Sequence, residues 1–291
     1  MSVISRSEAA PSTTPPLILR PSRGLGSLNL RDLWLYRELV YFLTWRDIKV
    51  RYKQTLLGAA WAVLQPFMQM VVFTLLFNKV ANLSSEGVPY PIFNYTALLP
   101  WGLFTKALTD AGRSLVANRN MITKVYFPRL VIPVSSMLSG LVDFLIAFLV
   151  LIGLMVYYRV APTAAVWTLP FYLLLALVTA LGFSLWLSAL NVIYRDVGYV
   201  LPFLTQIWFF VTPIVYSSRE VLDQWGLQGF WRVLYYVNPM VGVVDGFRWA
   251  ILGVGTPPGP LLAVSVGVSI VVLVTGLYYF RHMERTFADE I

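Results

Sequence analysis

Long apolar runs separated by short polar segments dominate the pattern along this chain of 291 residues. A helix needs about 20 apolar residues to cross the hydrocarbon core of a bilayer. Six runs reach or approach this length, and each predicts a membrane span: residues 54–77, 92–116, 131–158, 166–193, 199–216 and 261–280. The pattern therefore predicts an all-α, polytopic membrane protein with six transmembrane helices.

A seventh apolar segment, residues 231–252, is a poor candidate for a full span. It contains Arg232, Asp245 and Arg248, and Pro239 interrupts it. Each charge at a helix centre costs about 2.5–3.5 kcal/mol on insertion scales. Proline within membrane depth is tolerated where the backbone is buried in protein or faces a wet cavity. We therefore expect a re-entrant pair of short outer helices between spans five and six.

Residues 29–53, before the first span, carry aromatic and basic side chains at helical spacing. The aromatic and aliphatic stripe consists of Leu30, Trp34, Tyr41, Trp45, Ile48 and Tyr52. The neighbouring, mostly basic stripe consists of Arg31, Glu38, Arg46, Lys49 and Lys53. Stripes of this kind side by side are typical of an amphipathic helix in the membrane interface. The basic residues Arg46, Lys49, Arg51 and Lys53 are either a topological anchor or a site for an anionic lipid headgroup.

The distribution of Lys and Arg sets the orientation of the spans. With six spans, the residues up to Lys53, the turn 113–129, Arg195, Arg281 and Arg285 all fall on one side. The basic side is cytoplasmic, so both termini are expected inside. The Ser-, Thr- and Pro-rich residues 1–28 lack the apolar region of a signal peptide and predict a flexible cytoplasmic tail. Residues 29–291 are then a single transmembrane domain.

Composition supports the membrane class and narrows the chemistry. The chain is 58% hydrophobic and 12% charged, whereas soluble domains carry about 25% charged residues. It has no cysteine, which excludes disulfides and thiolate chemistry. No GxxxxGK[ST], HExxH or GxSxG motif occurs, so the chain has no phosphate-binding loop of its own and no catalytic set. A lipid-modifying membrane enzyme is therefore disfavoured, and no metal or cofactor is expected in this chain.

Two charges lie deep within predicted spans, Lys106 in the second and Asp143 in the third. Ionisable residues inside a membrane are expensive and mark functional sites by default. One isolated carboxylate is a thin basis for an ion-coupled transporter. We therefore expect Asp143 to form an interhelical hydrogen bond or to be the partner of Lys106.

Four ordered blocks resemble the membrane subunit of polysaccharide-exporting ABC transporters, the family of permeases for O-antigen, capsule and teichoic acid. The blocks are RELVYFLTWRDIKVRYKQTLLGAAWAVLQP (37–66), NRNMITKVYFPRLVIP (118–133), NVIYRDVGYVLPFLTQIWFFVTPIVY (191–216) and YYVNPMVGVVDGFRWAILG (235–253). The resemblance covers the chain from Asp32 to Glu284. It implies a permease in the bacterial cytoplasmic (inner) membrane that works as a homodimer on two ATP-binding cassette subunits, with ATP and magnesium bound by those partners. It also implies a glycan substrate on a polyprenyl pyrophosphate lipid, and no nucleic acid.

This resemblance gives the candidate residues their roles. The basic group Arg46, Lys49, Arg51 and Lys53 would meet the pyrophosphate at the cytoplasmic surface. Aromatic faces would bind sugars weakly along a glycan channel, with Phe67, Phe73, Phe77, Trp208, Phe209 and Phe210 as candidates. Two cytoplasmic turns would receive force from the ATPase, through Asn118, Arg119, Lys124, Arg129, Arg195 and Asp196. An exporter of the same architecture that moves teichoic acid, capsule, a drug or a simple lipid stays open as the alternative.

Overall fold

The computed structural model of the chain describes residues 30–53, 60–194, 196–224, 226, 228–284 and 287. All regular structure in these residues is helical, as predicted. In chain order the elements are α1 (Leu30–Leu35), α2 (Arg37–Lys53), α3 (Ala60–Phe73), η2 (Thr74–Val80), α4 (Tyr90–Ala117), α5 (Arg119–Lys124), α6 (Val131–Tyr158), η3 (Ala164–Thr168), α7 (Leu169–Ile193), α8 (Val197–Val211), α9 (Ser218–Gln224), α10 (Phe230–Tyr236), α11 (Pro239–Leu252) and α12 (Pro260–Met283). The tail 1–28 and the first residues of the first predicted span, 54–59, lie outside the described residues.

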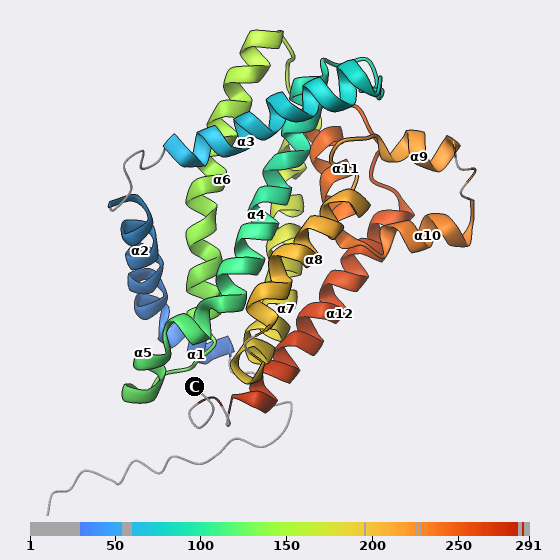
Figure 1. The fold of residues 1–291 in the computed structure, drawn as a ribbon. Coiled ribbons are helices and arrows are strands. Elements are labelled where there is room, and N and C mark those ends of the chain that lie inside the picture. The colour runs from blue at the N-terminus through green and yellow to red at the C-terminus, as the bar shows by residue number, and fades with distance from the viewer. Residues whose placement is uncertain are drawn as a thin grey trace, which may run out of the picture.

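The long helices α4, α6, α7 and α12 form a bundle with α4 near its centre (Figure 1). Buried side chains of α4, among them Phe93, Tyr95 and Phe104, fill the core between its neighbours. Close contact between α7 and α12 depends on two glycines. A Cβ on Gly276 would collide with the carbonyl oxygen of Gly182, and one on Gly182 would meet the backbone of α12. Small residues allow such close packing of membrane helices.

Four helical stretches of the described chain are long and apolar enough to cross a membrane: Ala60–Val80, Val131–Tyr158, Ala164–Ile193 and Pro260–Met283. They correspond to the first, third, fourth and sixth predicted spans. The second prediction falls on α4, whose 28 residues give ample length although polar side chains lower its hydropathy. The fifth falls on α8, whose 15 residues span only about 22 Å. The multi-pass helical class is confirmed, and the count of six stays a prediction.

The fifth predicted span, 199–216, is wrong at its C-terminal end. α8 ends at Val211, and the chain then turns at Pro213 instead of continuing as a helix. Arg248, on α11, stabilises this turn from a distance. Its guanidinium donates hydrogen bonds to the main-chain oxygens of Pro213 (2.7 Å), Ile214 (2.7 Å) and Tyr216 (2.9 Å). These bonds satisfy carbonyl groups that a helix would otherwise have paired.

The segment predicted to be re-entrant, 231–252, consists of the two short helices α10 and α11, as its interruption at Pro239 indicated. Asn238 caps α11 by accepting a hydrogen bond from the backbone N–H of Met240 (3.1 Å), and Pro239 occupies the first helical position. Asp245 of α11 is buried and accepts hydrogen bonds from Ser218 (2.7 Å) and Tyr236 (2.8 Å). These contacts join α9, α10 and α11 into one layer.

The predicted interfacial helix 29–53 is divided at Tyr36 into α1 and α2. α2 packs along α6 (Figure 1). Thr44 donates to the main-chain oxygen of Ser135 (3.3 Å), and Arg51 donates to Asp143 (2.6 Å). Because residue numbers rise together on both helices, α2 runs parallel to the first turns of α6. Trp34, Tyr41 and Trp45 of the aromatic stripe are exposed, whereas Tyr52 at its end donates to Asp143 of α6. The place of this stripe in a membrane interface stays a prediction.

Candidate functional site

A cavity of about 510 Å³ lies between the end of α2 and helices α3, α4 and α6. Its charged end consists of Arg51, Lys106, Asp110 and Asp143, joined by the hydroxyl of Tyr52. Its other end carries aromatic, amide and hydroxyl side chains from α3 and α4: Trp61, Gln65, Gln69, Trp101, Thr105 and Thr109. A volume of this size is typical of sites for small ligands.

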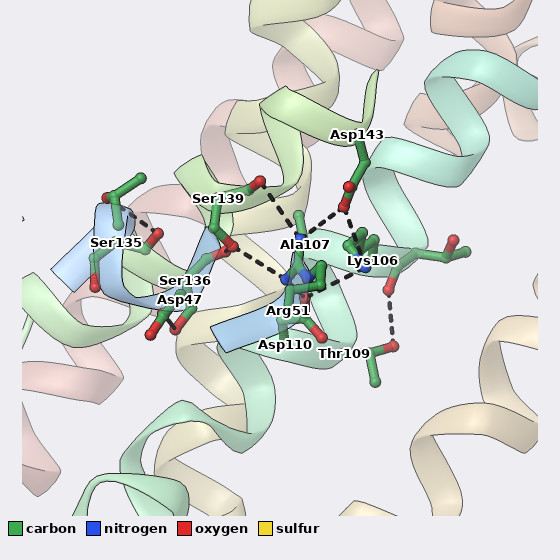
Figure 2. A network of polar contacts seen from close by, with 12 residues as sticks. Asp47, Arg51, Lys106, Ala107, Thr109, Asp110, Ser135, Ser136, Ser139 and Asp143 are labelled. Atoms are coloured by element: carbon green, nitrogen blue, oxygen red, sulfur yellow. Dashed lines mark hydrogen bonds and ion pairs between the residues drawn. The ribbon is translucent and has the colours of Figure 1, made fainter. Parts of the chain in front are cut away.

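Arg51 is the centre of the charged end (Figure 2). Its guanidinium donates to Asp143 (2.6 Å), Asp110 (2.9 Å) and the hydroxyl of Ser139 (3.2 Å). The hydroxyl of Tyr52 donates to the other oxygen of Asp143. Burial and then this hydrogen bond raise the pKa of Tyr52 above its usual value, so the hydroxyl keeps the proton that it donates. The network thereby fastens the end of α2 to α4 and α6.

Lys106 joins the same network more loosely. Its ammonium lies 3.3 Å from Asp143 and 3.9 Å from Asp110, and neither contact has hydrogen-bond geometry. Asp143 is therefore a partner of Lys106, as the sequence indicated, although its closer partner is Arg51. The two cations and two carboxylates balance, so the charged end carries no net formal charge.

Small residues of α6 allow α2 to approach closely enough for these contacts. Ser135, Ser136 and Ser139 face α2, and each contributes a polar atom to the contact. Asp47 accepts a hydrogen bond from Ser136 (3.4 Å), while Leu43 is buried in the same interface. The side of α2 that faces the bundle is thus a mixed polar and apolar face, and it includes Tyr52 of the aromatic stripe.

The structure does not gather the four predicted headgroup residues at one place. Arg51 turns into the cavity. Arg46 donates to Asp47 (2.8 Å) and to Asn118 at the end of α4 (2.9 Å). Lys49 lies over the Trp45 ring, 5.3 Å from its centroid, and Lys53 is exposed.

The predicted channel aromatics divide into two groups. Phe73 contacts Phe77 and Phe209, with ring centroids 5.8 and 5.3 Å apart, and Phe209 contacts Trp101 of the cavity wall. Trp208 packs in the core against Phe104 and Phe183 and donates to the amide oxygen of Asn238 (2.9 Å). Phe67 and Phe210 are exposed. The structure therefore brings Phe73, Phe77 and Phe209 together, next to the cavity.

The predicted coupling residues lie around α5 and the start of α8. Asn118 ends α4, and its side-chain amide donates to the main-chain oxygen of Ser114 (2.8 Å). Arg119 and Lys124 are exposed on α5. Arg129 is held by Glu284 beyond α12, to whose carboxylate its backbone N–H donates (3.2 Å). Asp196 is exposed at the start of α8, and Arg195 lies outside the described residues.

Sequence reasoning missed the polar stripes of the cavity. Trp61, Gln65 and Gln69 recur every four residues on α3, and Trp101, Thr105 and Thr109 do so on α4. Residues four apart share one helix face, so the spacing in the sequence indicates that each set lies on one side of its helix.

The cavity has no metal-binding cluster among the described residues. It offers cationic and carboxylate groups, amides, hydroxyls and indole rings, which is the chemistry of a binding site for a polar, charged molecule.

Comparison with known proteins identifies the class. The pattern of the family of ABC-2 type transporters matches residues 38–252, and the chain belongs to this family. The chain is 29% identical over 263 residues to the O-antigen export system permease protein RfbA of Myxococcus xanthus, covering 90% of this chain and 98% of that protein. It is 28% identical over 253 residues to RfbA of Klebsiella pneumoniae, covering 87% and 94%. It is 24% identical over 251 residues to the polysialic acid transport protein KpsM of Escherichia coli, covering 82% and 91%.

Proposed function

We propose that this chain is the permease subunit of an ATP-driven exporter that moves a polysaccharide across the bacterial cytoplasmic membrane. The main support for this proposal is the similarity of the chain, over nearly its full length, to permeases named for O-antigen export. The similarity to a polysialic acid transport protein supports it as well. The substrate is an O-antigen-like glycan on a polyprenyl pyrophosphate lipid. The cavity supports this proposal because it combines cationic groups with aromatic and amide side chains.

The chain works as a homodimer with two ATP-binding subunits, which bind ATP and magnesium. No phosphate-binding loop occurs in the sequence, so the energy for transport comes from those partners. They press on the cytoplasmic turns around α5 and Asp196. Six spans, two cytoplasmic termini and an outer re-entrant segment complete the arrangement. α5 is well suited to this contact because it is short and exposed and its neighbour Asn118 is bonded to Arg46 of α2.

The roles of the charged groups follow from their surroundings. Lys49 and Lys53 are exposed at the end of α2, where cations attract an anionic pyrophosphate by about 1 kcal/mol each. The aromatic group Phe73, Phe77 and Phe209 lies beside the cavity and gives the glycan apolar faces without fixed charge. Weak and repeated contacts of this kind let a polymer move in steps.

Reconstitution tests the proposed function. The permease and its ATP-binding partner are incorporated into vesicles that carry a polyprenyl-pyrophosphate-linked polysaccharide, and a lectin measures the glycan that crosses the membrane. We expect glycan transport only with both subunits and hydrolysable ATP. Transport of a glycan-free lipid or of small amphiphilic cations at comparable rates, with no glycan movement, would instead support a drug or simple-lipid exporter.

A further inference from the structure

Two polar stripes face the cavity from neighbouring helices. Trp61, Gln65 and Gln69 line it from α3, and Trp101, Thr105 and Thr109 line it from α4. Each stripe holds one indole ring and two short polar groups at a spacing of one helical turn. The hydroxyls of Thr105 and Thr109 donate to main-chain oxygens of α4 and can still accept a hydrogen bond. Stacking and hydrogen bonding are therefore available from both sides of the same space, which is the combination that a sugar ring requires.

The two glutamines stand out on α3 because the helix belongs to a stretch apolar enough to span a membrane. Polar side chains at such positions are costly unless their hydrogen-bonding groups are satisfied. Both are exposed, and neither side-chain amide forms a hydrogen bond with any residue that the structure describes. Each amide can donate and accept hydrogen bonds, so both can form hydrogen bonds with a ligand in the cavity.

Lys106 is the cation that remains available at the charged end. Arg51 directs its guanidinium at Asp143, Asp110 and Ser139, whereas the ammonium of Lys106 makes only loose ion pairs with the two carboxylates. An entering anion can therefore take Lys106 while Arg51 and Tyr52 continue to hold Asp143. An ammonium binds phosphate as a point charge and needs no fixed geometry.

We propose that this cavity binds the junction between phosphate and sugar in the lipid-linked glycan, with the phosphate on Lys106 and the first sugar between the two stripes. Gln65 and Gln69 would then be specificity-determining residues for the sugar next to the lipid. The inference rests on the proposed function. The volume of about 510 Å³ accommodates a phosphate with one or two sugar rings but not a polymer, so the site acts where transport begins.

Depth in the membrane is consistent with a loading site. Lys106 lies about three turns before the end of α4 at Ala117, or roughly 16 Å along the axis, and Asp143 lies roughly 18 Å from the start of α6. Both distances are measured from the connection that contains α5, the expected cytoplasmic side. A headgroup carried in from the inner leaflet would reach the charged end before the outer helices.

Cysteine protection tests the inference without measuring transport. The chain has no cysteine, so Gly102→Cys places a single reporter on the wall of the cavity, where an added Cβ meets no other atom within 4 Å. The full permease with its ATP-binding partner is placed in nanodiscs, and the rate of reaction with a water-soluble thiol reagent is measured. The probes are polyprenyl pyrophosphate carrying one N-acetylated sugar, polyprenyl pyrophosphate alone, and phosphatidylglycerol.

We expect the sugar-bearing probe to slow the reaction about tenfold more than the sugar-free probe, and phosphatidylglycerol to have no effect. Lys106→Gln should remove protection by both pyrophosphates, by about ten- to a hundredfold in affinity, since it deletes a charge-assisted contact. Lys106→Arg should retain it. The matched control Lys79→Gln, which removes an exposed cation outside the cavity, should leave protection unchanged.

A second experiment tests whether the two glutamines recognise the sugar. Gln65→Leu combined with Gln69→Leu should abolish the difference between the two pyrophosphate probes, while the control Gln206→Leu on α8 should preserve it. Equal protection by phosphatidylglycerol would show a general lipid site, and unaltered protection in Lys106→Gln would overturn the assignment. If vesicles export glycan while no probe protects Gly102→Cys, the inference fails and the proposed function stands. If protection holds while no glycan is exported, the proposed function fails instead.

Discussion

Two arginine-centred groups, one around Arg248 and one around Arg51, use different hydrogen-bond acceptors. Arg248 is 1% exposed, lies 3.6 Å from the centroid of the Phe93 ring and donates only to main-chain oxygens. Arg51 has a side chain that is 25% exposed, and its strongest bonds go to the carboxylates of Asp110 and Asp143. The Arg248 group holds the turn that follows α8, and the Arg51 group borders the cavity.

Arg248 holds the fold, whereas the charges around Arg51 can serve a ligand. Main-chain carbonyls are fixed by the helices and turns around them, so Arg248 has no alternative set of partners. Carboxylate side chains can rotate and share cations, as Asp143 does between Arg51, Tyr52 and Lys106. A buried arginine on fixed acceptors therefore stabilises one conformation, whereas exchangeable ion pairs beside a cavity allow an anion to enter.

Site-directed labelling gives an all-or-none test of whether the two groups lie toward opposite membrane surfaces. Asp223 on α9 and Asn120 on α5 are exposed. Asp223→Cys should react with an impermeant reagent added outside intact cells, and Asn120→Cys should react only after permeabilisation. The native chain without cysteine is the control. Reaction of both reporters from the same side would remove the distinction between an inner and an outer group.

Replacement of Arg248 should give the largest loss of stability. Arg248→Leu leaves four main-chain oxygens without their donor, and we expect a cost of about 3–5 kcal/mol. Arg248→Lys should cost almost as much, because one ammonium cannot reach acceptors spread over Phe93, Pro213, Ile214 and Tyr216. Thermal aggregation in detergent, followed by size-exclusion chromatography, measures both. If Arg248→Lys is as stable as the unsubstituted protein, the positive charge alone, and not the geometry of the guanidinium, stabilises this turn.

Replacement of Asp143 should cost less. Asp143→Asn keeps the shape of the side chain but removes the charge that faces Arg51 and Lys106, and we expect a loss of about 1–3 kcal/mol. A double-mutant cycle with Arg51→Gln should give a coupling energy of about 1–2 kcal/mol. The same cycle between Asp143 and the distant Arg232 is the control. A coupling near zero for Arg51 and Asp143 would mean that the pair contributes nothing measurable.

The sequence predicts most accurately the helices that consist of uniform apolar runs. The prediction 131–158 coincides with α6, and 261–280 lies within α12. The end of the fifth span could not be predicted, because its turn depends on Arg248, which is distant in sequence and meets it only in the folded chain. Apolar length alone cannot reveal that an arginine will satisfy the carbonyls where a helix stops.

The cavity was predictable only in part. The partnership of Lys106 with Asp143 followed from their being the two charges deepest in spans. The inward turn of Arg51 did not follow, because Arg51 belongs by sequence to a run of basic residues, and its direction is set by the packing of α2 on α6. The spacing of Gln65 and Gln69 was visible in the sequence but was obscured by the stronger aromatic signal of the phenylalanines.

Reversal of the exposed cations of α2 should have the smallest effect on stability, so it separates a role in function from a role in folding. Lys49 lies over Trp45 and Lys53 is exposed, so Lys49→Glu with Lys53→Glu should change the free energy of unfolding by no more than about 0.5 kcal/mol. If these residues attract the pyrophosphate, each reversal removes roughly 1 kcal/mol of attraction, and glycan export should fall several-fold. Arg219→Glu, a reversal of an exposed cation on α9, is the control. Normal export from a correctly inserted Lys49/Lys53 variant would leave these residues as topological anchors and restrict headgroup binding to the cavity, because Lys106 and Arg51 would then be the remaining cations next to the substrate path.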